Sequence, residues 1–291
     1  MEPPRYLFRT FSPGSDGSNS CTGFCSMAKA NGYDMITRED LSDNEARTML
    51  TDHVLWQSWE KRDDDIFISF TPSLYFALLH GLRKVDRCRR TNRANCFVAI
   101  IDTSFYPAGT FSRTLDLLDH YGLDERDHRN LLRDYHQGEY LAEFELLTDG
   151  AEVSMQVSLE ALANSGNLFG LWPEFEDYQC KGKLVKALGF IRSTWYRVET
   201  PITQPCIAAA RQFAQCFGGK WYLPLMVWVL ASRARSSNDG QLREEFSDGW
   251  NGIRLSRYQI VSHELILCRE HRRTLPLPKP DSRPTSRVTR A

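Results

Sequence analysis

A short apolar strand that runs directly into a helix is the feature that most constrains the fold of this chain. Residues 66–82 read IFISFTPSLYFALLHGL, and four of the first five are apolar β-forming types. Pro72 ends the strand, because its ring lacks an N–H for a β-ladder and pushes the preceding residue toward extended geometry. Leu74, Leu78 and Leu82 then recur at helical spacing. The sequence therefore predicts a strand followed at once by a helix.

Two hydroxyls lie at the end of this strand. Ser69 and Thr71 are two positions apart, so their side chains point to the same face. Thr71 or Ser73 can cap the helix that follows. A pair of hydroxyls at the start of a helix is a good place to hold a polar ligand. The alternative is a buried strand and helix with incidental hydroxyls, since apolar runs are usually core.

The charge balance and the lack of long apolar runs exclude some classes of protein. The 291 residues include 36 Lys and Arg against 37 Asp and Glu, which predicts no general affinity for nucleic acid or anionic membranes. Residues 1–14 contain no apolar signal core, and the most apolar window, residues 221–231, is too short to span a bilayer. We expect a cytoplasmic protein with a buried helix at 221–231.

The eight cysteines show no disulfide framework and no set of zinc ligands. Cys21 and Cys25 are close, but no second pair at zinc-site spacing completes them. We expect reduced thiols and no bound metal. The histidines His53, His80 and His136 fit no catalytic triad by position, and His80 is expected to be a packing or surface residue.

Hydrophobic periodicity predicts the remaining elements. Strands are predicted at residues 5–11, 95–102, 137–147 and 151–159, and helices at residues 39–61, 112–134, 205–217 and 221–233. Residues 12–20 are rich in glycine and serine and predict a loop. This order predicts an α+β fold whose strands gather on one or two small sheets.

Charged residues stand out on two of these strands. Arg9 shares a strand face with Leu7 and Phe11, so it either reaches an anion or lies at a solvent-exposed edge. Gln137 and Glu139 point to one side at the start of a later strand. A rival acidic pair, Glu143 and Glu145, lies deeper in that strand.

Taken in order, the arginine, the Ser-x-Thr segment and the Gln-x-Glu segment resemble the Arg–Ser-Thr-Ser–Glu class of ADP-ribosyltransferases, the cholera-toxin-like branch. The segments YLFR, FISFT and GEYL are also similar to those of a group of fungal proteins. The resemblance covers residues 5–160. It implies an ART-like domain at residues 1–165, built on a split pair of small β-sheets with flanking helices. A helical C-terminal extension at 166–271 and a disordered tail at 272–291 would follow.

The resemblance also implies roles for single residues. Arg9 matches the arginine that contacts the phosphate and ribose of NAD, and Ser69 matches the first serine, which orients the site. Thr71 stands for the last serine, whereas Phe70 replaces the usual threonine. Glu139 matches the catalytic glutamate.

The resemblance also implies roles for Gln137 and Tyr75. Gln137 matches the residue that steers the acceptor in the same class. The ring of Tyr75 either stacks on nicotinamide or lies in the core. Glu139 is preferred to Glu143 and Glu145, because the family glutamate usually precedes the apolar run of its strand.

The implied activity is cleavage of NAD, used as a substrate, with transfer of ADP-ribose to a macromolecule such as a protein. Cleavage of the nicotinamide–ribose bond passes through an oxocarbenium-like state, which a carboxylate stabilises. The alternatives are an NAD glycohydrolase, a catalytically inactive binding module of the same fold, and an interaction protein unrelated to this class.

Overall fold

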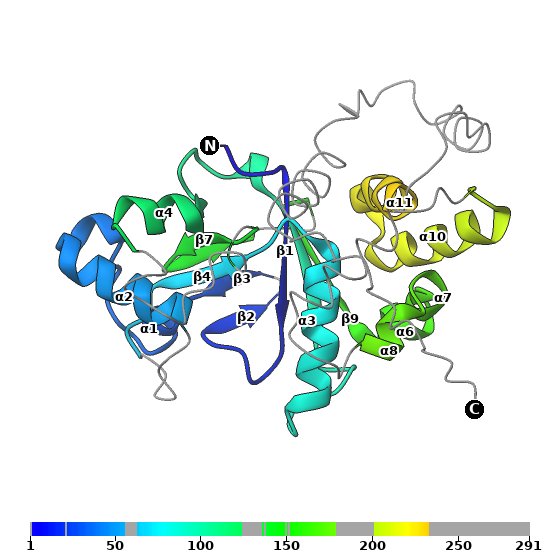
Figure 1. The fold of residues 1–291 in the computed structure, drawn as a ribbon, viewed down its shortest axis with the longest axis horizontal. Helices are drawn as coiled ribbons and strands as arrows, with labels where there is room; N and C mark the ends of the chain where they lie inside the picture. Colours follow the sequence, from blue (N-terminus) through cyan, green and yellow to red (C-terminus); the bar gives the residue numbers. More distant parts are fainter. Residues whose placement is uncertain are drawn as a thin grey trace, which may run out of the picture.

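The computed structural model describes residues 2–20, 22–55, 63–123, 136, 138–148, 150, 152–178 and 201–232. Within these ranges the chain forms an α+β fold, in which small separate sheets lie among helices (Figure 1). The fold class predicted from the order of the elements is confirmed. The tail predicted at residues 272–291 lies outside the described residues.

The strands of the described ranges form three sheets of three strands each, rather than the one or two predicted. The first sheet has the order β1-β5-β9, with bounds Tyr6–Phe11, Phe97–Asp102 and Ser154–Ser158. The second has the order β4-β7-β6, with bounds Phe67–Phe70, Tyr140–Glu143 and Ser112–Arg113. The third has the order β2-β3-β8, with bounds Ser18–Ser20, Gly23–Cys25 and Glu145–Leu147.

The extra sheet arises because one predicted strand is broken. Residues 137–147 were expected to form a single strand with Phe144 on the same face as Tyr140 and Leu146. Instead Phe144 has a φ of 57°, the left-handed region that non-glycine residues rarely adopt. This turn sends Phe144 into a different apolar cluster from Tyr140 and Leu146. It divides the segment into β7 and β8, which pair in different sheets.

Helices flank the sheets on both sides in the view of Figure 1. The α-helices are α1 Met27–Ala30, α2 Asp43–Leu55, α3 Leu74–Arg87, α4 Thr114–His120, α6 Leu159–Asn164, α7 Leu168–Leu171, α8 Glu174–Tyr178, α10 Gln204–Phe217 and α11 Tyr222–Ala231. Short 3-10 turns occur at η1 Arg38–Asp40, η2 Thr103–Phe105 and η3 Gly219–Trp221. The helices predicted at 205–217 and 221–231 are confirmed, and half of the residues of α11 are buried.

Helix α3 follows β4 directly, as the sequence predicts. The Ser73 hydroxyl accepts the Phe76 N–H at 3.1 Å and caps the helix, in line with the known preference for serine at this position. A Cβ on Gly81 would lie 2.9 Å from Leu159 and 3.0 Å from Thr10. Glycine therefore lets α3 lie close against β1 and α6.

The largest apolar cluster joins α3 to the first sheet and to the C-terminal helices. Its buried members include Leu78 of α3, Ile100 of β5, Val157 of β9, Phe213 of α10 and Leu225 of α11. Burying side chains of this size contributes about 1.5–3 kcal/mol each. Helices α10 and α11 thus share one core with the strands that hold Arg9.

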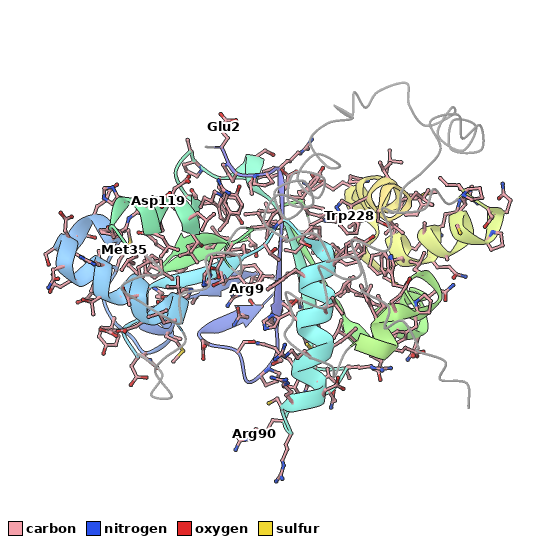
Figure 2. All side chains as sticks on the ribbon, in the orientation of Figure 1. Glu2, Arg9, Met35, Arg90, Asp119 and Trp228 are labelled. Carbon is pink, nitrogen blue, oxygen red and sulfur yellow. The ribbon has the colours of Figure 1, made fainter. Side chains whose placement is uncertain are left out.

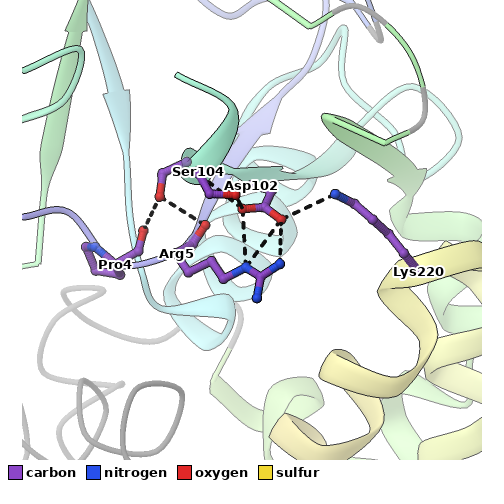
Figure 3. A network of polar contacts seen from close by, with 6 residues as sticks. Pro4, Arg5, Asp102, Ser104 and Lys220 are labelled. Atoms are coloured by element: carbon purple, nitrogen blue, oxygen red, sulfur yellow. Dashed lines mark hydrogen bonds and ion pairs between the residues drawn. The ribbon is translucent and has the colours of Figure 1, made fainter. Parts of the chain in front are cut away.

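A buried carboxylate also ties these helices to the N-terminal strands. Asp102 is 0% exposed, and its carboxylate accepts hydrogen bonds from the Arg5 guanidinium at 3.3 Å, the Lys220 ammonium at 3.3 Å and the Ser104 hydroxyl at 2.6 Å. Figure 3 shows Arg5 and Lys220 reaching the same carboxylate from opposite sides. Burial opposes ionisation of Asp102, but the bonds from Ser104 and Arg5 outweigh it and lower the pKa.

Candidate functional site

Strand pairing brings together three residues that lie far apart in the sequence. Strands β1 and β4 meet at a bridge next to Arg9, with two backbone hydrogen bonds of 2.7 and 2.8 Å. Strands β4 and β7 pair antiparallel, with Ser69 opposite Leu141. Because side chains alternate along a strand, Glu139, two residues before Leu141, belongs to the same face as Ser69. Arg9, Ser69 and Glu139 therefore converge.

Arg9 is held by neutral groups. Its Nε donates to the Asn19 Oδ1 at 2.8 Å, and one terminal nitrogen donates to the Ser69 carbonyl at 2.8 Å. The rings of Phe24 and Phe70 lie 5.9 and 5.8 Å from its guanidinium carbon. Figure 2 places it beside β1, toward β2 and β4. These contacts exclude the alternative of an edge arginine in solvent.

Arg9 nevertheless lies in an electrostatically unusual position. Burial lowers its pKa to about 10, although the negative charges of Asp16, Asp65 and Glu139 act in the opposite direction. At neutral pH it is still a cation. No carboxylate of the described residues makes an ion pair with it.

Ser69 lies at one end of a hydrogen-bonded chain that the sequence did not reveal. Its hydroxyl is 2.9 Å from His53 Nε2, and His53 Nδ1 is 2.7 Å from Asp65 Oδ2. The other Asp65 oxygen accepts the Phe67 N–H at 2.9 Å, which fixes the carboxylate. Burial lowers the pKa of His53, but the charge of Asp65 and its hydrogen bond outweigh burial, so the pKa is raised.

Glu139 is paired with a second histidine. His136 is 3% exposed, and its Nδ1 lies 2.6 Å from Glu139 Oε2. Burial opposes ionisation of Glu139, yet the hydrogen bond and charge of His136, the charge of His53 and a hydrogen bond from Ser69 together lower its pKa. The carboxylate is 18% exposed and is thus ionised and accessible at neutral pH.

A cationic group lies on α3 near Arg9. Lys84 donates to the Ser15 hydroxyl at 2.5 Å, and burial together with the charge of Arg9 lowers its pKa. One turn earlier, burial and the positive charges of Lys84, Arg9 and Arg83 lower the pKa of His80 to about 3. His80 is therefore neutral, and the local field favours an anion.

The two carboxylates of the rival pair, Glu143 and Glu145, form contacts with other residues. Glu143 accepts from the Arg38 backbone N–H at 2.9 Å and makes an ion pair with its guanidinium at 3.5 Å. Glu145 makes an ion pair with Lys29 at 3.4 Å. Glu139, in contrast, lies 2.6 Å from His136 Nδ1, and the charge of His53 helps to lower its pKa.

The structure places the other predicted site residues, Thr71, Tyr75 and Gln137, in different surroundings. The Thr71 hydroxyl accepts the Ser73 N–H at 3.2 Å and so helps form the turn into α3. Tyr75 is 1% exposed and packs against Trp172 and Trp228, so its ring lies in the core and not at the site. Gln137 lies outside the described residues.

Sequence reasoning missed four residues of this site: His53, Asp65, His136 and Lys84. His136 stands three positions before Glu139, a spacing that could have suggested a contact. His53 meets Asp65 and Ser69 only because α2 packs beside β4, and no local pattern encodes that packing. The expectation that these histidines fit no triad is therefore corrected for His53.

Within the described residues, no group of three or more His, Cys, Asp or Glu side chains is arranged to hold a metal ion. No helix in the same ranges is long and apolar enough to cross a membrane.

Comparison with known sequences adds one match. No curated protein matches the chain at a significant level. Residues 2–145, just under half of the chain, match the family model described as a Domain of unknown function (DUF7587). The matched range contains Arg9, Ser69 and Glu139 but ends within β8, before β9 and the C-terminal helices.

Proposed function

We propose that the protein binds NAD, cleaves its nicotinamide–ribose bond and transfers ADP-ribose to a macromolecular acceptor. One observation carries the proposal. The cation of Arg9, the hydroxyl of Ser69 and the carboxylate of Glu139, each assigned by resemblance to a role at an NAD site, gather around β4. Had they lain on opposite sides of the fold, the resemblance would have had no chemical meaning.

The carboxylate suits the bond-breaking step. Loss of nicotinamide leaves positive charge on the ribose, and an ionised, fixed carboxylate stabilises that charge without reorganising during the reaction. Glu139 fits this role, because His136 holds one oxygen and the lowered pKa keeps the group ionised. Its free lone pairs can also accept a hydrogen bond from a ribose hydroxyl.

The positive charges of Arg9 and Lys84 are suited to binding the diphosphate of NAD. Arg9 and Lys84 have only neutral partners among the described residues, and charges that are removed from water are normally compensated. A pyrophosphate would supply the missing negative charge, with Arg9 able to bond it through its remaining N–H groups. In this arrangement the phosphates lie toward α3 and the ribose toward Glu139.

Phe70 stands where the family usually has a threonine, but this replacement does not remove a hydroxyl from the strand face that carries Ser69. Strand alternation puts Phe70 on the face opposite to Ser69 and Thr71. Its ring is 2% exposed and contacts Phe24 and Phe111 in the core. The site face therefore keeps its serine and its threonine.

The proposed fold is that of the ADP-ribosyltransferase class, with β1 and β4 as the inner strands of a split pair of sheets. The bridge between these strands and the helix that leaves β4 support this assignment. The helices α10 and α11 would then brace the first sheet from outside.

The experiment is incubation of the full chain with NAD and measurement of free nicotinamide. Glu139→Gln is expected to lower the rate of release by about 10²- to 10³-fold, because a fixed negative charge at the ribose is lost. Glu145→Gln is the matched control. Its carboxylate lies on the same segment but pairs with Lys29, so the rate should not change.

The remaining possibilities give different results. Nicotinamide release without ADP-ribose on any acceptor would make the protein a glycohydrolase. Binding of NAD without release would make it an inactive binding module. A folded chain that neither binds nor cleaves NAD would overturn the proposal.

A further inference from the structure

A basic segment at the end of α3 extends beyond the proposed site. Residues 83–93 read RKVDRCRRTNR, so Asp86 is the single acidic residue among six basic ones. The whole chain, in contrast, has 36 Lys and Arg against 37 Asp and Glu. Arg87, Arg89 and Arg90 are exposed. Figure 2 places Arg90 at one tip of the molecule, beyond the end of α3. Positive charge is therefore concentrated on one short surface segment.

Residues 87–95, which we name the arginine loop, are held in a defined shape by side-chain amides. The Asn92 N–H donates to the Asn95 Oδ1 at 2.7 Å, and the Asn95 N–H donates to the Asn92 Oδ1 at 3.0 Å. The Asn95 Nδ2 also donates to the Arg90 carbonyl at 3.1 Å. These three bonds fold the backbone that carries the arginines into a turn.

The arginine loop is also fixed to the body of the protein. The buried Thr91 hydroxyl donates to the Ser12 hydroxyl at 3.2 Å. The Arg93 carbonyl accepts the Glu160 N–H at 3.0 Å, and the Arg93 guanidinium lies over the Phe169 ring, 4.9 Å from its centroid. Arg93 therefore contributes to holding the loop in place.

The three exposed arginines have no such contacts. Within the part of the chain that the structure describes, the side chains of Arg87, Arg89 and Arg90 make no hydrogen bond or ion pair. Like charges that a fold holds close together repel each other, so this arrangement works against stability. An anionic partner would remove the repulsion. A defined loop that presents three such cations is thus better explained by binding than by stability.

The arginine loop lies against the segment that contacts a cation of the proposed site. Ser12, which accepts from Thr91, stands three residues before Ser15, whose hydroxyl accepts from Lys84. Lys84 itself lies less than one helical turn before Arg87 on α3. The positive charge of the arginine loop therefore continues along α3 toward the site.

We propose that the arginine loop is a docking surface for an acidic segment of a partner protein. The planar guanidinium groups match carboxylates through paired N–H donors, which makes arginine better suited than lysine to such contacts. Binding of this segment does not require NAD and so goes beyond the proposed function. The partner is also the acceptor of ADP-ribose, and this part of the inference rests on the proposed function.

Two other anionic partners fit the arginine loop less well. Single-stranded nucleic acid is normally bound with aromatic side chains on which the bases stack, and the loop contains no aromatic residue. Duplex binders that depend on charge make on the order of six to ten phosphate contacts, more than three exposed arginines supply. Polybasic segments that bind anionic membranes usually have about four to eight Lys and Arg.

The first test measures binding of a fluorescein-labelled deca-glutamate peptide to the full chain by fluorescence anisotropy, without NAD. Arg89→Gln/Arg90→Gln should weaken binding about tenfold, because two charge-assisted contacts are lost. The control Arg47→Gln/Arg211→Gln removes the same charge from exposed positions on α2 and α10 and should bind like the wild type. An equal loss in both double variants would mean an effect of net charge and would overturn the proposal.

The second test changes the shape of the arginine loop without changing its charge. Asn95→Ala removes the amide that bonds Asn92 and the Arg90 carbonyl. Peptide affinity should fall by about two- to tenfold, because arginines that the loop no longer holds must be ordered on binding. Thermal unfolding verifies that the variant is folded. Unchanged affinity in a folded Asn95→Ala would show that no built docking surface exists.

The same assay compares other partners. Duplex DNA and vesicles of phosphatidylcholine and phosphatidylserine should bind more weakly than the peptide. Tighter binding of either, lost in Arg89→Gln/Arg90→Gln, would assign the arginine loop to that partner and overturn the proposal. Self-association of the chain in sedimentation, lost in the same variant, would overturn it in favour of a second copy.

The outcomes separate this inference from the proposed function. Peptide binding that depends on Arg89 and Arg90, without nicotinamide release, would leave the docking surface and remove the NAD proposal. Nicotinamide release without such binding would do the reverse. If both hold, Arg89→Gln/Arg90→Gln should raise the KM for a glutamate-rich acceptor about tenfold, whereas nicotinamide release to water should not change. An unchanged KM would show that the docked protein is not the acceptor.

Discussion

The Lys84 ammonium donates to the Ser15 hydroxyl over 2.5 Å, and the described part of the chain gives it no carboxylate partner. Burial lowers its pKa, so the fold disfavours the charge that this residue carries. A cation kept in such a place is better explained by a ligand than by stability. The neighbouring Arg9 is in the same situation.

Lys84→Met is therefore expected to separate stability from binding. The free energy of unfolding should stay unchanged or rise by up to about 1 kcal/mol, because an unpaired charge is removed. The affinity for ADP or pyrophosphate should fall about tenfold, the equivalent of about 1.4 kcal/mol. Calorimetric titration and urea denaturation measure the two quantities. Lys220→Met is the control, since it loses an ion pair to Asp102 and should lower stability without changing ADP affinity.

Replacement of His136 should change the pH dependence of Glu139. His136→Leu removes a donor at 2.6 Å and should raise the pKa of Glu139. The pKa of Glu139 is lower in the folded protein than in the unfolded chain. Ionised Glu139 therefore stabilises the fold fully at pH values above its unfolded pKa, and this stability is lost as the pH falls through its folded pKa. The deficit of His136→Leu against wild type should thus shrink at low pH, as measured by urea denaturation. His136→Asn keeps an N–H near Nδ1 and should resemble wild type.

His80 should make the protein sensitive to acid. Its folded pKa of about 3 lies below the ordinary value near 6.5, so the unfolded chain takes up this proton first as pH falls. Stability is then lost progressively from about pH 7 toward pH 3. His80→Gln should reduce this loss in urea denaturation at pH 7 and pH 4.5. An identical pH dependence in the two proteins would contradict the assignment.

Replacement of Asp102 should reduce the stability of the fold more than replacement of Arg5, although the two residues form one ion pair. Asp102→Asn weakens three charge-assisted contacts at a fully buried position and should reduce stability by about 1–3 kcal/mol. The Arg5 side chain is 58% exposed, so Arg5→Met should change stability by less than about 1 kcal/mol. Thermal unfolding of the two variants makes the comparison. A larger loss in Arg5→Met would mean that the network depends on Arg5.

Local pattern was enough to predict most strands and helices of the described residues, because period-two and period-3.6 apolar spacing reports directly on which face is buried. The failures have local causes that the pattern hides. Phe144 has the same apolar character as its neighbours, yet its positive φ reverses the alternation and divides one strand into two. The strand at Ser18–Ser20 lies in a segment whose composition is typical of a loop.

The sequence by itself determined the strand that presents Ser69, the helix that follows it and the arginine on the first strand, whereas the preference for Glu139 came from the resemblance. The tertiary structure alone decided that His53, Asp65, His136 and Lys84 belong to the same site, and that Tyr75 does not. The physical reason is that periodicity fixes the face to which a side chain points, whereas its partners depend on which elements pack together. That packing follows from burial of apolar surface over the whole chain, which no single segment encodes.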